Sequence, residues 1–346
     1  MSRRVSRERM GIAAVLSAMA LVVLDAGIVN VALPTIGAAF AETPAQVLLI
    51  VSAYQVALLI GLLPCAHIAD RIGYRRLFLS GILLFGCSSL LCALAPTLPL
   101  LVAARFLQGL GGAAIMSLGI ALLRFALGAD RVAAAIAWNA LVVAICAALA
   151  PALGALVLSF ASWRWLFMIA LPMAAMAVIA TPALPAVRAT TRSFDLLSVS
   201  LYAAAATSVV AAAELARVTP FAAFSIAVAA ASCAFWLYAR QRMRHAPLIP
   251  LDLLALRPFR ASVAASVFFF IGQSAGLLAL PFYLQLSLAR STATVGLIVA
   301  LWPLAVAATS SVANRLADRF SSGSLCAVGG IVLASGLAVI ALWPVG

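Results

Sequence analysis

Long apolar runs alternate with short polar segments along the whole chain. Most of these runs reach the roughly 20 residues that a helix needs to cross the hydrocarbon of a bilayer. Read in this way, the sequence predicts eleven membrane-spanning helices, over about residues 11–33, 47–67, 77–95, 98–123, 132–159, 165–183, 197–213, 221–239, 261–284, 293–313 and 326–343. The expected fold class is therefore an all-α membrane protein.

The composition agrees with this pattern. Of the 346 residues, 66% are hydrophobic and 9% are charged, so the apolar runs cannot all be buried in one soluble core. The first span is too long for the core of a signal peptide and lacks a small-residue cleavage pattern, so we expect it to be retained. We expect a multi-pass protein of the cell (inner) membrane, in contact with the lipid bilayer.

The charges predict the orientation of the chain. All 22 basic residues are arginine: 18 fall on the side of the N-terminus, three (Arg164, Arg217 and Arg290) on the other side, and Arg105 within a helix. Loops rich in arginine stay in the cytoplasm, so this split predicts a cytoplasmic N-terminus. Because the net charge of +13 is spread over short loops and forms no basic domain, we expect no nucleic-acid partner.

The sequence lacks motifs for metal or covalent chemistry. Phosphate-loop, zinc and nucleophile-elbow motifs are absent, so nothing supports an enzyme and no cofactor is expected. The cysteines lie in or beside apolar helices without CxxC or Cys/His ligand spacing. We therefore expect buried thiols, with no disulfide and no metal, at Cys65, Cys87, Cys92, Cys146, Cys233 and Cys326.

One carboxylate, Asp25, lies deep within the first apolar run. An ionisable group in mid-membrane costs roughly 3 kcal/mol on insertion scales, so such residues usually face a polar cavity and have a function there. With 1.5 Å of rise per residue, Asp25 lies roughly 12 Å below the outer end of its helix and Arg105 roughly 10 Å below the outer end of the fourth. The two charges are thus expected at similar depth.

This pairing supports two interpretations. Arg105 favours the ionised form of Asp25 and desolvation favours the protonated form, so Asp25 could take up and release a coupled proton with Arg105 as its counter-charge. Alternatively, the two residues form a static buried ion pair that fixes the helices in register. We favour the first interpretation.

The chain contains an internal echo. Residues Ile68–Ile72 follow the second helix of the first block, and the similar Leu316–Phe320 follow the second helix of the last block. Repeated halves of this kind are the architecture of one large class of transporters. A polar stretch at Pro185–Asp195 and a basic segment over 240–260 lie between the two blocks.

Four motifs in the expected order resemble the major facilitator superfamily, and within it the fourteen-helix drug:proton antiporter branch. Leu24–Pro34 resembles the first-helix motif LDxTIVNVALP, with Gly27 where Thr is usual. Ala66–Arg76 resembles the loop motif GxLADRxGRRR, Leu101–Ala113 resembles the fourth-helix motif, and Trp163–Phe167 resembles the start of helix six. The resemblance covers essentially the whole chain.

The fifth-helix antiporter motif of this branch, GxxxGPxxGG, is only partly present. It retains Pro151 and Gly154, while Ala150 stands where the glycine before the proline is usual. Pro151 should bend the helix, either as a hinge or as a fixed kink. Small pairs such as Gly109/Ala113 and Ala150/Gly154 are expected to allow close helix contact.

The resemblance implies an organisation into three parts: a six-helix bundle over 1–184, two inserted helices with linkers over 185–260, and the first three helices of a second bundle over 261–346. That second half would be incomplete, and we favour truncation over completion by a partner chain. The resemblance also implies a cytoplasmic gating loop in alternating access; alternatively, its arginines only hold the loop in the cytoplasm. The loop residues are Asp70, Arg71, Gly73, Arg75, Arg76 and, in the echo, Asp318 and Arg319.

Function follows from these features as an expectation. We expect a proton-coupled efflux transporter for small amphipathic molecules. Because no second acid is evident in mid-membrane and the lining is otherwise apolar, an uncharged or cationic substrate fits better than a small anion, which Arg105 leaves open. The alternative is a truncated, non-transporting scaffold or sensor that keeps the fold. Polar or aromatic residues that could line a substrate cavity, or equally bond a neighbouring helix, are Asn30, Gln55, Gln108, Trp138, Asn139 and Gln273.

Overall fold

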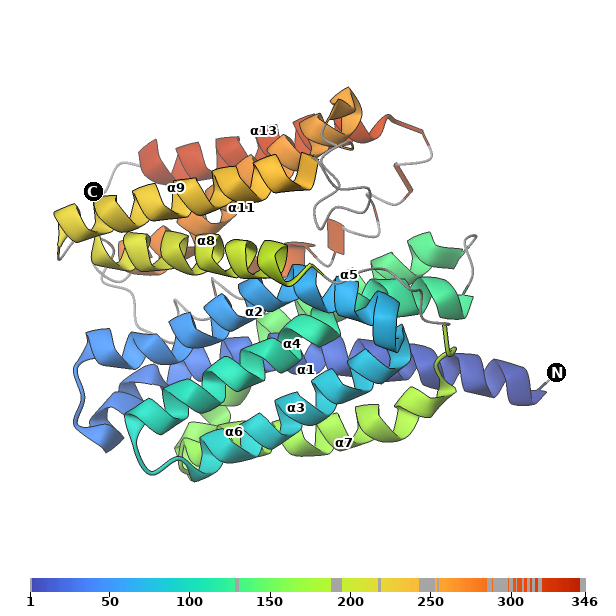
Figure 1. The fold of residues 1–346 in the computed structure, drawn as a ribbon, viewed down its shortest axis with the longest axis horizontal. Coiled ribbons are helices and arrows are strands. Elements are labelled where there is room, and N and C mark those ends of the chain that lie inside the picture. Colours follow the sequence, from blue (N-terminus) through green and yellow to red (C-terminus); the bar gives the residue numbers. More distant parts are fainter. Residues whose placement is uncertain are drawn as a thin grey trace. The chain divides into compact units, whose positions relative to one another are not determined.

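The computed structural model describes residues 2–127, 131–187, 195–216, 219–242, 253, 255–284, 288, 298, 301–302, 304–306, 308–309, 312, 315–316 and 319–342. Within these residues the long elements are all helices (Figure 1). They are α1 (Ser2–Phe40), α2 (Pro44–Ile72), α3 (Tyr74–Leu94), α4 (Leu98–Leu127), α5 (Val132–Phe160), α6 (Arg164–Met168), α7 (Ala170–Ala180), η2 (Thr181–Ala183), α8 (Leu196–Leu215), α9 (Pro220–Arg242), α11 (Arg257–Phe282) and α13 (Ser322–Leu342).

The predicted all-α membrane fold is confirmed. In the part of the chain that the structure describes, nine helical stretches are long and apolar enough to cross a membrane. They correspond to nine of the eleven predicted spans. Of the other two, 261–284 coincides with helix α11, and most of 293–313 lies outside the described residues.

Helix six forms the stretch Arg164–Ala183, in agreement with the predicted span 165–183, but it is not one unbroken helix. The segment is divided into α6, α7 and the 3-10 turn η2. Pro172 has no N–H to donate and its ring clashes with the carbonyl four residues earlier, which belongs to Met168, the last residue of α6. The proline therefore accounts for the division.

The ends of several helices extend beyond the predicted spans, because an apolar count detects only the part of a helix that lies in hydrocarbon. Helix α2 begins at Pro44 with a capping box: Gln46 N–H donates to Thr43 Oγ1, and Thr43 N–H donates to Gln46 Oε1. It ends where Gly73 adopts φ +96°, a conformation that favours glycine. The chain then reverses directly into α3.

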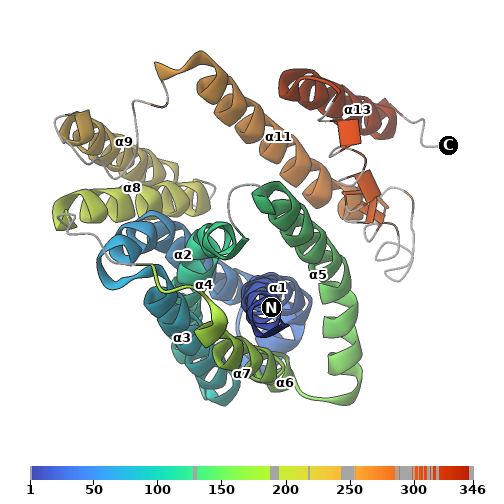
Figure 2. The ribbon, with the colours of Figure 1, turned by 90° about the vertical axis from the view of Figure 1, so that its right-hand side faces the viewer.

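The chain divides into two compact units, one formed by residues 1–146 and 150–249 and the other by 147–149 and 250–346. In the first unit, α1 runs through the middle, with α2, α4 and α7 packed against it (Figure 2). Helices α8 and α9 pack on each other, and α8 lies along α2, where Tyr202 Oη donates to the Leu59 carbonyl at 2.9 Å. In the second unit, α11 packs against α13. The three-part division of the chain stays a prediction.

Glycines on α4 bring three helices into backbone contact. A Cβ added at Gly109 would lie 2.4 Å from the Tyr54 carbonyl oxygen of α2, and one added at Gly111 would lie 2.7 Å from the Phe85 nitrogen of α3. Neither neighbour is a side chain that can turn away. The expected packing role of the small residues on α4 is thus seen at these positions, and it fixes α4 tightly between α2 and α3.

The core of the first unit has two apolar clusters separated by a polar layer. One cluster includes Val22 of α1 and Ile115 of α4, and the other includes Ile28 of α1 and Ala104 of α4. Buried polar side chains lie between them along the chain, at Asp25, Ser88, Ser89, Arg105 and Gln108. The mid-membrane region of the bundle is therefore polar and closed to solvent.

The expectation of uniformly buried thiols was wrong. All six cysteines are free, but only Cys92 is buried, while Cys87 and Cys326 are exposed on helix surfaces. Lipid tails are as apolar as a protein core, so a cysteine in a span can face outward without cost. Apolar surroundings in the sequence therefore did not require burial within the protein.

Replacement of Gly109 by Ala should lower the thermal stability of the detergent-purified protein. The added methyl group meets backbone on α2, and overpacking of this kind costs about 1–3 kcal/mol. Gly336→Ala on α13 is the matched control, because nothing lies within 4 Å of the added Cβ. Unfolding midpoints measured by fluorescence should fall for Gly109→Ala and stay level or rise for Gly336→Ala; equal midpoints would contradict the close contact.

Candidate functional site

The two mid-membrane charges that the sequence places at similar depth form an ion pair. Arg105 Nη1 on α4 donates to Asp25 Oδ2 on α1 at 2.5 Å. The residues are only 1% and 5% exposed, respectively. Removing one member of such a buried pair leaves an uncompensated charge and typically costs about 3–5 kcal/mol. The pair therefore joins α1 to α4 at the level where the apolar clusters separate.

Gln108 completes the hydrogen bonding of the carboxylate. It lies three residues after Arg105, on the same face of α4. Its Nε2 donates to Asp25 Oδ1 at 3.0 Å and to Ser89 Oγ of α3 at 2.8 Å, while its Oε1 accepts from Arg105 Nη1 at 2.6 Å. Both carboxylate oxygens of Asp25 are thus bonded, and three helices meet at one amide.

Aromatic rings surround the guanidinium. Arg105 Cζ lies 4.2 Å from the centre of the Tyr54 ring on α2 and 5.8 Å from that of Phe167 on α6, distances at which cation–π attraction acts. Within the described residues, the buried Tyr54 hydroxyl and Arg105 Nε have no hydrogen-bond partner. If the site opened, the Arg105 Nε–H group could donate to a new partner, and the Tyr54 hydroxyl could donate to or accept from one.

Tyr54 is not among the predicted site residues, because a tyrosine in an apolar span resembles an ordinary core residue. The depth count that pairs Asp25 with Arg105 could have found it. Tyr54 lies ten residues after Pro44, the outer end of α2, or roughly 15 Å into the membrane at 1.5 Å per residue. That depth is close to the level of Asp25.

The residues proposed for a substrate cavity differ in burial and in hydrogen bonding. Only Gln108 belongs to the hydrogen-bonded group around Asp25. Asn30, Gln55 and Trp138 are exposed, Asn139 and Gln273 are half-buried, and Asn139 Oδ1 is buried without a hydrogen-bond partner in the described part of the chain. No hydrogen bond seen among the described residues links Asn30, Gln55, Trp138 or Asn139 to the ion pair. Their role as cavity residues stays a prediction.

The loop between α2 and α3 is held by its own side chains. Tyr74, which stands where the family motif has an arginine, donates its hydroxyl to Asp70 Oδ1 at 2.8 Å. Arg75 Nη1 donates to the Leu184 carbonyl at 3.3 Å and so attaches the loop to the segment after η2. Arg71 and Arg76 are exposed. In the echo of this loop, Arg319 N–H bonds the Leu316 carbonyl at 3.0 Å, and Asp318 lies outside the described residues.

The partly kept motif of α5 meets α1 close to the ion pair. A Cβ added at Gly27 would lie 2.5 Å from the Ala150 Cβ, and one added at Gly154 would lie 3.2 Å from the Ile28 carbonyl oxygen. Gly27 stands where the first-helix motif of the family has a threonine. Ala150 stands where the fifth-helix motif has a glycine. In this chain the glycine of the contact is therefore on α1 and the alanine on α5.

A second polar cluster, which we did not predict, joins α8 to α9. Asp195 caps α8 and accepts two hydrogen bonds from Arg240 of α9, at 3.1 and 3.2 Å. Ser198 donates to Asp195 and accepts from Gln241 at 2.7 Å. The Arg240 hydrogen bonds hold the pKa of Asp195 well below its usual range, and those from Ser198 act in the same direction. The sequence signal that could have indicated this helix cap is an aspartate three residues before a serine at the start of a helix.

The fold and the mid-membrane charges define a polytopic transporter, and comparison with known proteins agrees. The sequence profile described as Major Facilitator Superfamily matches residues 15–346. The chain belongs to this superfamily of membrane transporters.

Several curated relatives resemble the chain over most of its length. "Uncharacterized transporter YebQ" of Escherichia coli (strain K12) is 37% identical over 94% of this chain and 72% of its own length. "Putative multidrug resistance protein MdtD" of Serratia proteamaculans is 29% identical over 90% of this chain, and the Klebsiella pneumoniae subsp. pneumoniae protein of that name is 32% identical over 86%. The chain spans 66% and 64% of the lengths of these two MdtD proteins.

Solved structures show the same fold. The proton:xylose symporter XylE superposes with a TM-score of 0.63 at 14% identity, over 92% of this chain and 70% of XylE. The human organic anion transporter MFSD10 superposes with a TM-score of 0.58 at 16% identity, over 88% of this chain and 71% of MFSD10. At such low identity the likeness shows the fold alone.

Gly27→Thr, which introduces the residue usual in the family motif, should destabilise the protein, because its Cβ would overlap that of Ala150. We expect a loss of about 1–3 kcal/mol. Adding Ala150→Gly should recover most of it, because the second change removes the overlapping methyl group. Thermal midpoints of the two single variants and the double variant form a cycle that measures the coupling; additive effects would contradict the contact between these two positions.

The Asp195–Arg240 pair should stabilise the protein down to acidic pH. A carboxyl with a depressed pKa in the folded state contributes stability above its unfolded-state pKa of about 3.9 and loses it as the pH falls toward the folded-state value. Asp195→Asn should therefore lower the unfolding midpoint by a similar amount at pH 8 and pH 5, and by less at pH 3. A difference between wild type and variant that is already lost at pH 6 would contradict the assignment.

Proposed function

We propose that this protein is a proton-coupled exporter of small amphipathic molecules, in which Asp25 carries the proton and Arg105 is its counter-charge. The proposed exporter lies in the inner membrane with its N-terminus in the cytoplasm and works by alternating access, driven by the proton gradient without a bound cofactor. The observation that supports it best is the buried pair between Asp25 and Arg105. Membership of a transporter superfamily supports the general class.

The cost of the pair argues for a role in turnover. Two charges in mid-membrane are expensive, and a packing contact between α1 and α4 could be made by apolar side chains instead. In the closed arrangement the carboxyl group of Asp25 is bonded to Arg105 and Gln108. When α1 and α4 separate, the carboxylate loses these donors and accepts a proton at the freed oxygen. Opening of the site is then coupled to protonation of Asp25.

The neighbours of Arg105 hold the counter-charge in place while this happens. Gln108 Oε1 accepts one of its N–H groups, and the Tyr54 ring faces its guanidinium. Arg105 therefore stays buried and favourably placed after Asp25 is neutralised. A counter-charge held in this way favours release of the proton when the helices close again.

The proposed substrate class rests on the residues around Asp25 and on the names of two relatives. Among the described residues of the polar layer, the acidic residue is Asp25. Its carboxylate can attract a cationic substrate only after it has separated from Arg105. The two MdtD proteins carry multidrug resistance in their names. We therefore propose uncharged or cationic amphipathic compounds as substrates, with Asp70 and Arg75 holding the cytoplasmic loop during the cycle.

Asp25→Asn should abolish proton-driven dye efflux from inverted vesicles, by at least tenfold. The amide cannot carry the proton, although it can still accept a hydrogen bond from Arg105. Glu42→Gln is the matched control, because it neutralises a carboxyl in the α1–α2 connection without touching the ion pair. Membrane insertion of both variants is checked by the yield of monodisperse protein. Unchanged efflux in Asp25→Asn would refute the proton role.

A static ion pair is distinguished by proton counting. If Asp25 carries the proton, binding of dye to the detergent-purified wild type shifts its proton content, and Asp25→Asn binds dye without that shift. If the pair is only structural, the proton change is the same in both proteins.

Each efflux assay is repeated on the chain extended through its downstream reading frame, since its MdtD relatives are longer. Efflux by the extended chain alone would assign the activity to the longer protein.

A further inference from the structure

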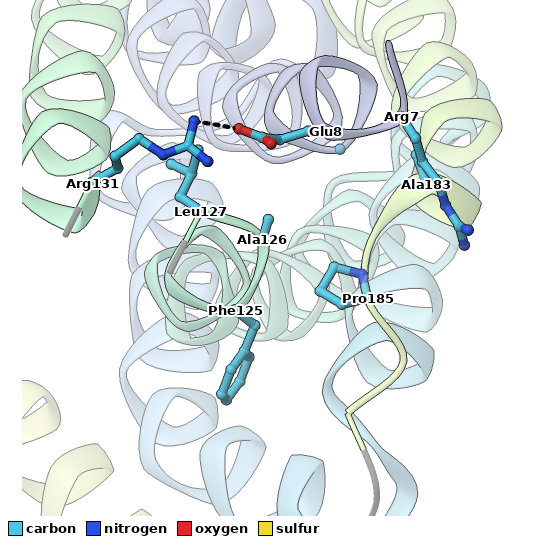
Figure 3. A pocket seen from close by; sticks show the side chains of 9 residues that line it. Arg7, Glu8, Phe125, Ala126, Leu127, Arg131, Ala183 and Pro185 are labelled. Carbon is cyan, nitrogen blue, oxygen red and sulfur yellow. Dashed lines mark ion pairs between the residues drawn. The ribbon is translucent and has the colours of Figure 1, made fainter. Parts of the chain in front are cut away.

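A cavity with charged and apolar walls opens at one end of the first unit (Figure 3). Its volume is about 630 Å³. The start of α1, the end of α4, the start of α5 and the segment after η2 form its walls. The lining residues are Arg7, Glu8, Gly11, Phe125, Ala126, Leu127, Arg131, Ala183 and Pro185.

The cavity lies where these helices leave the membrane. The predicted spans 11–33 and 98–123 place Arg7 shortly before the first span and Leu127 shortly after the fourth. Arg131 directly precedes the predicted span 132–159. The cavity therefore lies at the membrane surface, on the side that the arginine distribution predicts to be cytoplasmic. A ligand there meets lipid headgroups on one side and water on the other.

The charges of the cavity suit a single negative charge. Two arginines and one glutamate give the lining a net charge of +1. Arg131 Nη1 bonds Glu8 Oε1 at 2.7 Å, yet the Arg131 side chain is 59% exposed and the Glu8 side chain 27%. Arg7 lies beside Ala183 and Pro185, where its Nη2 donates to the Pro182 carbonyl at 3.5 Å, a long hydrogen bond. Both guanidinium groups have N–H donors that a bound anion could engage.

The rest of the lining is apolar. Phe125, Ala126 and Leu127 form the end of α4 between the two arginines, and Pro185 faces them (Figure 3). A soluble phosphate would leave this surface in contact with water. A phospholipid can place its phosphodiester against an arginine of the lining, and its glycerol and first acyl carbons against the apolar residues. Basic pockets between helices on the cytoplasmic side of a membrane bind anionic headgroups in this way.

We propose that this cavity binds the phosphodiester headgroup of an anionic phospholipid of the phosphatidylglycerol type, through Arg7 and Arg131. Arg131 exchanges its bond to Glu8 for the phosphate, and Glu8 thereby competes with the lipid. The lipid then connects the start of α1 to the start of α5 in place of the ion pair. The proposal is independent of proton coupling and of the transported substrate.

The test is a lipid titration of the detergent-purified chain, followed by native mass spectrometry. Phosphatidylglycerol should bind at least tenfold more tightly than phosphatidylcholine. Arg131→Gln and Arg7→Gln should each weaken its binding about fivefold, the effect expected for one arginine near the membrane surface. Glu8→Gln should strengthen binding, because it removes the competitor of the phosphate. A gain from a neutral substitution cannot arise from misfolding.

Arg124→Gln is the matched control, because it removes an exposed arginine from the end of α4 without changing the cavity lining. It should change the affinity less than twofold. An equal loss in Arg124→Gln and Arg131→Gln would overturn the site in favour of diffuse surface charge. Weaker or unchanged binding in Glu8→Gln would overturn the exchange mechanism. Equal binding of the water-soluble headgroup glycerophosphoglycerol would overturn the lipid as the source of the phosphate.

Discussion

The ion pair between Asp25 and Arg105 is the constraint around which the first unit is arranged. Two charges can be buried in mid-membrane only if they meet with good geometry and if the remaining donors and acceptors are bonded. Gln108 and Ser89 supply these bonds from α4 and α3, and Tyr54 supplies an aromatic face from α2. The polar layer separates two apolar clusters. Four helices are thereby held at one depth, which is why the same residues determine both packing and the proposed chemistry.

Close helix contact is the second condition, because Asp25 and Ser89 have short side chains that reach their partners only where the helices approach closely. Gly109 and Gly111 let the backbones of α2 and α3 approach α4, and Gly27 lets α1 approach Ala150 of α5. The last contact involves two positions at which this chain differs from the family motifs. Gly27 stands where the first-helix motif has threonine, and Ala150 stands where the fifth-helix motif has glycine. Motif matching compares these two positions separately, whereas helix packing depends on the combined size of both side chains.

Several arginines that first indicate topology also have specific partners at the ends of the helices. Arg240 bonds Asp195 and joins α9 to α8, Arg75 bonds the Leu184 carbonyl, and Arg131 bonds Glu8 across a cavity. These contacts differ in burial, and hence in strength. The Asp195–Arg240 pair is partly shielded and cooperates with a helix cap, whereas Arg131 is more than half exposed and can exchange partners at little cost. The exposed pair is therefore the better candidate for ligand exchange.

The sequence by itself determined the membrane class, most of the spans, and the shared depth of Asp25 and Arg105. These properties depend on the length and composition of single segments and on the constant rise of a helix, which are local. Tertiary structure decided which helix faces meet: that Gln108 bonds Asp25, and that Tyr54 lies against Arg105. It also decided that Gly27 meets Ala150. Lateral contacts depend on helix rotation and packing, and in a chain this apolar every helix face looks alike, because lipid and protein interior have the same polarity.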